Sequence, residues 1–289
     1  MNFIRMFDKR IILMLAACVI AGCSKDIERT LVIRARTETS GTKTVLLEDL
    51  SVAFTADDRF AVFDGAGSRR EFSVRTLYDD GSADFMGSIS TPASSYTVVS
   101  PYMNGCYLDD GDLVVTVPEV QTAVAGSFDP AANVSVGCTE TIFGGANTLS
   151  LQNVCALLKF SVSEGTSYGS ALILSAGNSL SGEFSCTVDD APEASPVTGK
   201  TLDHVILQGE ISGGNWYYMA VCPSVLEGGF AFYLFDGEGS MEKLEDYSTV
   251  KSTARAVTLK RNVILNLGII GAEPGAAFEG LDGTVKFEW

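Results

Sequence analysis

The chain has very little histidine and no excess of positive charge. A single histidine, His204, stands among its 289 residues, which excludes sites that need two imidazole ligands, such as most zinc hydrolase and two-histidine iron centres. The 20 lysines and arginines are outnumbered by 36 aspartates and glutamates. A net charge of −16 with no basic run repels a phosphate backbone, so nucleic acid is excluded as a partner.

Helical periodicity is also missing, and short runs that alternate between apolar and polar residues stand in its place. Such alternation, broken by glycine, aspartate, asparagine or proline clusters, is typical of β-strands. With 46% hydrophobic and 19% charged residues the chain can bury a core. We predict an all-β fold with strands at 31–36, 50–54, 60–63, 72–74, 95–100, 113–117, 156–162, 171–175, 204–207, 216–221, 230–235, 256–259, 263–269 and 284–289.

Seven cysteines occur, but no pair has the CxxC spacing of a metal or redox site. Cys18 lies in an N-terminal apolar run and Cys23 stands three residues after its end, which leaves an odd number for the rest of the chain. We interpret the remaining five cysteines as mostly reduced core residues. The alternative is that one disulfide forms among Cys106, Cys138, Cys155, Cys186 and Cys222.

The N-terminus has the pattern of an export signal. A Lys-Arg pair precedes an apolar run at 11–20, which is too short to span a bilayer of about 30 Å. The Ile-Ala-Gly-Cys at 20–23 resembles a bacterial lipobox, so we expect residues 1–22 to be a signal peptide and Cys23 to be acylated. The Ser-Lys-Asp-Ile-Glu at 24–28 resembles the tag of surface-exposed outer-membrane lipoproteins of the Bacteroidales, although an isoleucine interrupts it.

A polar, glycine-containing stretch at 144–148 is the best candidate linker between two domains. The expected organisation is a signal peptide (1–22), an N-terminal segment with the first strand (23–36), two domains (37–147 and 148–271) and a C-terminal tail (272–289).

One motif matches the nucleophile pattern of a class of hydrolases. Residues 165–169 match the G-x-S-x-G nucleophile elbow around Ser167, and Asp189 or Asp190 and then His204 follow in hydrolase order. The elbow needs a helix after it, whereas residues 171–175 have strand character. We therefore predict a hairpin loop here, and a chain that is not an enzyme and has no catalytic residue, cofactor or metal. The acidic motif Asp-Asp-Gly-Asp at 109–112 is interpreted as a turn.

Several motifs, taken in order, resemble the fimbrillin family, lipoprotein precursors that build the donor-strand fimbriae of the Bacteroidales. They are the lipobox, Gly-Thr-Lys-Thr at 41–44, the strand at 58–63 before Asp64-Gly65, and the segments at 150–160, 180–182, 217–223 and 259–262. The resemblance implies two transthyretin-like β-sandwich domains in tandem. It also implies a structural or adhesive fimbrial subunit that assembles with its neighbours by strand exchange.

In this family the first strand is cut away after an arginine, and a neighbour's strand fills the groove. The resemblance places the cut after Arg36, with Arg29 and Arg34 as rivals; the alternative is that Arg36 is only a solvated charge on an edge strand. Removing a strand exposes unpaired edge groups, which an incoming strand satisfies by β-augmentation.

The C-terminal tail has the pattern of a donor strand, because Val285, Phe287 and Trp289 share one face. The alternative is that the tail folds back as an edge strand of its own second domain.

Besides neighbouring subunits, the expected partners are the outer membrane, through a lipid on Cys23, and an unspecified ligand on a host or bacterial surface. The alternative function is a surface carbohydrate-binding lipoprotein that does not polymerise, with an aromatic platform at 216–218.

We predict that Cys23→Ala abolishes lipid attachment, because the lipobox requires the thiol. Labelled fatty acid should be incorporated into the wild-type chain only, and the variant should leave the membrane fraction. A variant that still carries label and partitions with membranes would contradict the assignment.

Overall fold

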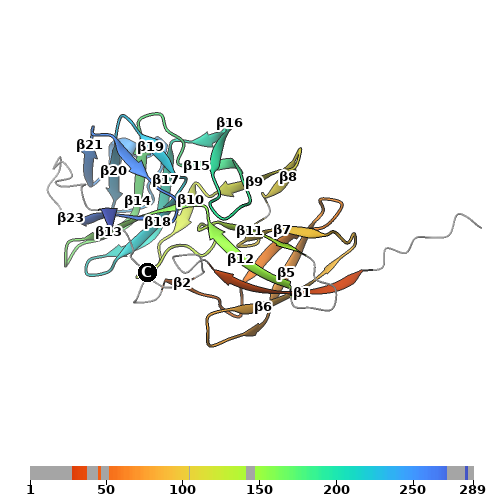
Figure 1. Ribbon diagram of the computed structural model, residues 1–289. Helices are drawn as coiled ribbons and strands as arrows, with labels where there is room; N and C mark the ends of the chain where they lie inside the picture. Colours follow the sequence, from red (N-terminus) through yellow and green to blue (C-terminus); the bar gives the residue numbers. More distant parts are fainter. Residues whose placement is uncertain are drawn as a thin grey trace, which may run out of the picture.

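The computed structural model describes residues 28–37, 45–46, 52–103, 105–140, 147–271 and 284–285, which are mostly β-strands (Figure 1). The only helical element in these ranges is a short 3-10 turn, η1 (Met241–Asp246). Among the same residues, no helix has the length and apolar character needed to cross a membrane. The all-β class expected from the alternation is confirmed.

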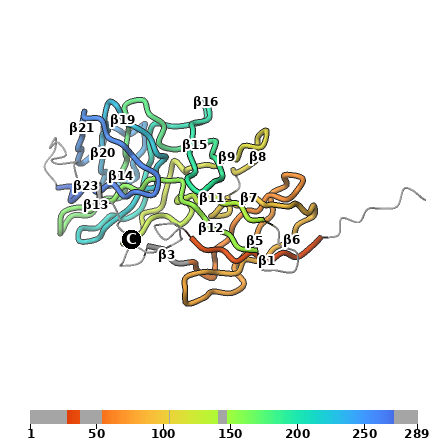
Figure 2. Tube along the Cα trace, in the orientation of Figure 1, coloured from red at the N-terminus to blue at the C-terminus, as the bar shows by residue number. Residues whose placement is uncertain are grey.

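Seven strands close into a barrel in the order β1-β12-β11-β7-β4-β5-β6, at the lower right of Figure 1. Their bounds are β1 (Arg29–Thr37), β4 (Arg59–Phe63), β5 (Arg69–Leu77), β6 (Ala83–Ile89), β7 (Ser95–Ser100), β11 (Ser135–Glu140) and β12 (Asn147–Asn153). The ring closes because β1 pairs antiparallel with β6 and parallel with β12. Figure 2 shows red β1 running beside green β12, which lies far away in the sequence.

The barrel is filled by aromatic side chains. Phe60, Phe72 and Phe85 have no exposed surface. The ring centroids of Phe60 and Phe85 lie 4.0 Å apart, and Phe54 meets Phe85 edge-on at 5.1 Å. Such ring pairs add about 0.5–1.5 kcal/mol each beyond their burial, so the interior is a packed core and not a channel.

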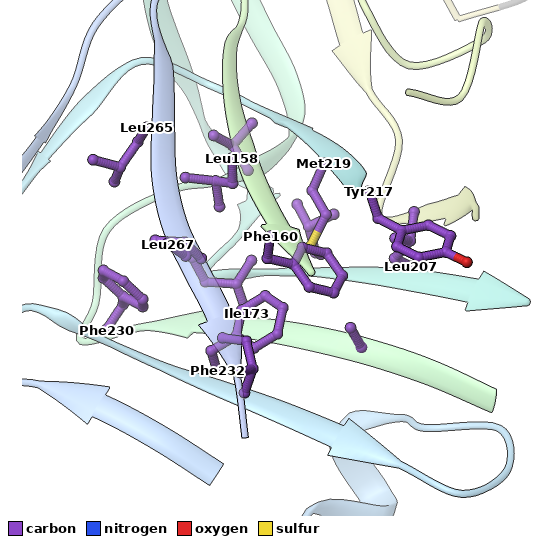
Figure 3. Packing of buried hydrophobic residues seen from close by; sticks show 14 of the residues in the cluster. Leu158, Phe160, Ile173, Leu207, Tyr217, Met219, Phe230, Phe232, Leu265 and Leu267 are labelled. Carbon is purple, nitrogen blue, oxygen red and sulfur yellow. The ribbon is translucent and has the colours of Figure 1, made fainter. Parts of the chain in front are cut away.

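The second half has two facing sheets, at the upper left of Figure 1. The first sheet has the order β10 (Val120–Thr122), β17 (His204–Ser212), β14 (Ser167–Ser175), β20 (Phe230–Phe235) and β21 (Thr249–Thr253). The second has the order β18 (Tyr217–Val221), β13 (Ala156–Val162), β23 (Ile264–Ile270) and β24 (Thr284–Val285). Figure 3 shows Phe160, Phe232 and Ile173 in the core between the sheets, where the rings of Phe160 and Phe232 meet edge-on at 4.8 Å.

The remaining strands form a four-stranded sheet and two short pairs. The sheet has the order β16 (Ala194–Leu202), β15 (Ser181–Cys186), β9 (Asp112–Val117) and β8 (Tyr107–Asp109). The pairs are β19 (Ser224–Leu226) with β22 (Val257–Leu259), and β2 (Val45–Leu46) with β3 (Val52–Ala53).

The β13–β18 sheet is buried on both faces, and this explains the nearly continuous apolar sequence of these strands. One face, with Leu158 and Met219, belongs to the sandwich core. The other face, with Leu157 and Ala220, shares a second core with β9, β15 and the barrel strands β4 and β7. The two halves of the chain are therefore joined by a common apolar core.

Strand pairing crosses the predicted domain boundary at 147. β12 begins at that residue and completes the barrel of the first half. From the first half, β8 and β9 join the sheet of β15 and β16, and β10 pairs parallel with β17. The facing sheets expected of a β-sandwich are present in the second half, whereas the first half closes into a barrel because β1 bonds to a strand on each side. The division at 147 stays a prediction about folding units.

We predict that Phe160→Ala lowers the free energy of unfolding by about 3–5 kcal/mol, because it leaves a cavity in the fully buried sandwich core. Urea unfolding followed by fluorescence measures the loss. Ile269→Ala on β23 is the matched control, since 60% of Ile269 is exposed, and it should change stability by less than about 0.5 kcal/mol. Equal losses in the two variants would contradict the assigned core.

Candidate functional site

The candidate site is built on β1, whose sequence alternates between a buried and an exposed face. Ile33 and Ala35 point into the barrel and are fully buried, and Leu31 is half-buried on the same face. Burying Ile33 contributes about 1.5–3 kcal/mol. The backbone of β1 is hydrogen-bonded along both edges, and the Asn147 side-chain amide also donates to the Val32 carbonyl.

The exposed face of β1 carries a charge network centred on Arg34. Its guanidinium donates to both carboxylate oxygens of Asp84, at 2.8 and 3.2 Å, and to the Tyr78 hydroxyl at 2.6 Å. The Tyr78 hydroxyl in turn donates to Asp84 at 2.8 Å, and the guanidinium lies 4.2 Å from the centroid of the Tyr78 ring. β1 is thus tied to β6 and to the turn before it by side chains as well as by backbone.

This network shifts the pKa values of its members. The hydrogen bond from Arg34 is the largest influence on Asp84 and holds the pKa of that carboxyl below its usual 3.8. The hydrogen bond to Asp84 raises the pKa of Arg34 and also that of Tyr78. Asp84 therefore stays ionised at a lower pH than an unperturbed aspartate.

Arg36, the predicted processing residue, lies at the end of β1 with 68% of its side chain exposed. Its guanidinium donates to Asp80 at 3.1 Å, and more than half of the Asp80 side chain is also exposed. Such a pair contributes about 0–1 kcal/mol and gives way easily. Of its rivals, Arg29 is also exposed, whereas Arg34 is held by two partners.

The predicted donor anchors are only partly within the described residues. Thr284 and Val285 form β24, which pairs antiparallel with β23 in the second-half sheet. The pairing of these two residues agrees with the alternative interpretation, in which the tail folds back on its own domain. Phe287 and Trp289 lie outside the described residues, as does the lipidation residue Cys23.

The elements of the hydrolase motif are not brought together. Ser167 pairs with Ser212 at one end of β14, whereas His204 pairs with Leu174 near the other end. Seven positions (174 − 167) separate them, or about 23 Å along a strand. The ring nitrogens of His204 instead contact Asp203 and Glu119, each at 3.0 Å.

The motif at 165–169 enters β14 from a loop, as expected, but this loop is not a hairpin. It links β13 and β14, which lie in opposite sheets of the sandwich. By contrast, the turn expected at 109–112 is confirmed: Asp110 and Gly111 both have positive φ and form a two-residue hairpin between β8 and β9.

No disulfide occurs among the described cysteines. Cys106, Cys155, Cys186 and Cys222 are buried, which agrees with the prediction of reduced core residues, and Cys138 is exposed. Burial raises the pKa of Cys155 to about 12 and that of Cys186 to about 12, so neither thiol is activated.

The aromatic segment at 216–218 does not form a sugar-binding platform. Tyr217 and Tyr218 are buried on opposite faces of β18. Trp216 is half-buried, and the Lys159 ammonium covers its ring at 4.4 Å from the centroid. These rings serve packing, because strand alternation sends neighbouring side chains into two different cores.

The network of Arg34, Tyr78 and Asp84 is the feature of this site that the sequence did not reveal. No strand was predicted at 83–89, so Asp84 had no assigned position beside β1. The alternation of Ala83, Phe85 and Ile89 is the signal that was available.

Comparison with known proteins gives structural neighbours only: no family model matches the chain, and neither does any curated protein sequence. A candidate cell adhesion protein of Bacteroides uniformis has 14% identity and a TM-score of 0.48, covering 84% of this chain and 94% of its own. The C-terminally truncated tip fimbrial protein Mfa3 of Porphyromonas gingivalis has 13% identity and a TM-score of 0.35, with coverages of 83% and 94%. A fimbrial assembly protein of Parabacteroides distasonis has 10% identity and a TM-score of 0.37, with coverages of 84% and 91%.

These neighbours are adhesion and fimbrial proteins of the Bacteroidales, the class that the sequence motifs resemble. Their identities and scores are low, so the function of this chain has to follow from its own strands and side chains.

We predict that Asp84 makes stability depend on pH in the acid range. A carboxyl with a lowered pKa contributes stability above its unfolded value, and the contribution is lost as the pH falls through the folded pKa. The melting temperature should therefore fall as the pH drops from about 4 through the lowered pKa of Asp84, and fall less in Asp84→Asn. The control Asp109→Asn, in the exposed β8–β9 hairpin, should retain the wild-type slope. Indistinguishable slopes for wild type and Asp84→Asn would contradict this role.

Proposed function

We propose that the chain is a structural or adhesive subunit of a cell-surface fimbrium. It is exported as a lipoprotein with its lipid on Cys23, which anchors it in the outer membrane. It assembles with neighbouring subunits by strand exchange, after proteolysis after Arg36 removes the first strand. A host or bacterial surface molecule is the remaining partner.

The observation that carries this proposal is the position of β1 in the barrel. β1 is the one strand that is bonded to both β6 and β12, so its removal opens the ring and unpairs two edges at once. It also uncovers the Phe-rich core that Ile33 and Ala35 seal. An open edge beside an apolar groove is unstable alone and is satisfied by a strand from another chain.

The surroundings of Arg36 favour cleavage at this residue. A protease needs an arginine side chain that can leave the surface, together with a backbone that can be drawn out of a sheet. Arg36 is exposed, has a weak ion pair, and lies next to the last residue of β1. Arg34 has the same charge but lies deeper in the strand and holds Asp84 and Tyr78.

The C-terminal tail is the proposed donor. Its described part is a two-residue strand that pairs with Ile264 and Leu265 of β23, so releasing this part breaks few backbone hydrogen bonds. Its sequence then offers Val285, Phe287 and Trp289 as anchors on one face. The carbohydrate-binding alternative has less support in the part of the chain that the structure describes, because the rings at 216–218 are packed or covered.

We predict that Arg36→Gln keeps the purified chain monomeric under a trypsin-like protease, because the barrel strand is then retained. The wild-type chain should lose β1, begin at Thr37 by N-terminal sequencing, and form polymers visible by size exclusion and electron microscopy. Arg29→Gln is the matched control and should behave as wild type. Polymers formed by chains that retain residues 29–36 would contradict the proposal.

A further inference from the structure

We propose that the donor tail enters the groove in the direction opposite to β1, with Val285 in the place of Ile33. This inference rests on the proposed function and adds the orientation and register of the incoming strand. It follows from the sizes of the three positions that β1 fills on its inner face.

The three positions differ in the room they offer. Ala35 and Ile33 are fully buried, whereas Leu31 is half-buried. We call them the Ala35, Ile33 and Leu31 slots. In chain order, the Leu31 slot is therefore partly open, the Ile33 slot is closed and of medium size, and the Ala35 slot is closed and small.

The small and medium slots have rigid walls. Ala35 pairs with Ala83 on β6, which is itself fully buried, and Ile33 pairs with Phe85. The Phe85 ring is fixed between Phe60 and Phe54, with centroid distances of 4.0 and 5.1 Å. Side chains larger than those of β1 would overpack this core at a cost of about 1–3 kcal/mol each.

The Leu31 slot accepts a larger side chain. Leu31, which pairs with Gly87, is only half-buried, so a longer residue in its place can extend to solvent. The Phe72 ring lies over Gly87, so closely that an added Cβ would meet it at 2.4 Å. An aromatic donor residue at this position can pack against that ring.

A tail that runs in the direction of β1 does not fit these slots when two or three of its anchors occupy them. With Val285 in the Leu31 slot, Trp289 falls in the Ala35 slot, and Glu288 replaces Arg34 beside Asp84. A shift of two residues in either direction puts Phe287 in the Ala35 slot or Trp289 in the Ile33 slot. Each of these arrangements forces an aromatic ring into a fully buried space built for a smaller residue.

In the reversed direction the sizes match. The donor places Gly283 in the Ala35 slot, Val285 in the Ile33 slot and Phe287 in the Leu31 slot. The two smaller residues thus replace fully buried residues of β1, and the large Phe287 ring replaces the half-buried one. Trp289 then reaches the end of the groove. Two other reversed registers place at least two anchors in the slots, and each forces an aromatic ring into the Ile33 slot: Phe287 when Val285 is in the Ala35 slot, and Trp289 when Phe287 is in the Ala35 slot.

Charges favour the reversed strand over the forward strand that has Val285 in the Leu31 slot. In the reversed strand Thr284 takes the place of Arg34, and its hydroxyl can donate to Asp84. The reversed strand also puts Asp282 in the place of Arg36, beside Asp80. The repulsion between these two carboxylates is screened by solvent, because 54% of the Asp80 side chain is exposed. The forward strand with Val285 in the Leu31 slot instead brings Glu288 to Asp84, whose side chain is 17% exposed and poorly screened. The forward strand with Val285 in the Ile33 slot would bring Lys286 to Asp84, so that register is excluded by the size of Phe287 in the Ala35 slot and not by charge.

The reversed strand also satisfies the backbone. It pairs antiparallel with β12 and parallel with β6, the opposite of the pairing of β1, and both ladders are complete in either geometry. Orientation is therefore decided by side-chain size and not by the supply of hydrogen bonds.

Thiol cross-linking tests the direction of the donor strand in subunits that have been cleaved after Arg36 and keep the rest of the chain. The acceptor carries Ser88→Cys on β6, opposite the position vacated by Thr30, and all chains carry Cys138→Ser to remove the exposed native thiol. The donor carries Glu288→Cys, which the reversed strand places beside that position. The matched control donor carries Thr284→Cys, which the forward strand with Val285 in the Leu31 slot would place there.

We expect several-fold more cross-linked dimer with Glu288→Cys than with Thr284→Cys. Gly283→Leu should also block assembly by overfilling the Ala35 slot, whereas Gly280→Leu in the same tail should not. Assembly with preferential cross-linking at 284, or an unaffected Gly283→Leu chain, would overturn the direction and leave the proposed function standing. Failure of the cleaved wild-type chain to assemble would overturn both.

Discussion

The hydrogen bonds along both edges of β1 are the constraint on which the barrel depends. A seven-stranded ring with one strand missing has two open edges, and here those edges belong to β6 and β12. The same strand covers the interior with Ile33 and Ala35, where Phe60 and Phe85 are already packed tightly. Closure and core sealing are therefore one event, because the residues that complete the ladder also complete the packing.

The second half of the chain provides a rigid support for this barrel. The sheet of β13 and β18 is buried on both faces, so one set of strands belongs to two cores. Ala61 and Val99 of the barrel pack in the same core as Leu157 of that sheet. A sheet covered on both faces has little freedom to shift, and the barrel strands that it touches are held in place even where β1 does not reach them.

The charges on the outside of β1 play a smaller energetic part than its buried face. The ion pair of Arg36 with Asp80 is largely exposed and contributes about 0–1 kcal/mol. Arg34 is better placed, because it bonds both Asp84 and Tyr78, but it is still partly solvated. We infer that these contacts help to set the register of β1, while the backbone ladder and Ile33 provide most of its stability.

Local alternation in the sequence determined the all-β class and many of the strands, since the predicted ranges 95–100, 156–162 and 230–235 coincide with β7, β13 and β20. It missed β16, whose exposed residues show no alternation, and β6, which supplies Asp84 to the site. Only the tertiary structure decided that β1 pairs with β12, and that β8 to β10 join strands of the second half. Alternation reports whether each residue is buried, which is a local property, whereas strand partners depend on which distant apolar faces pack together.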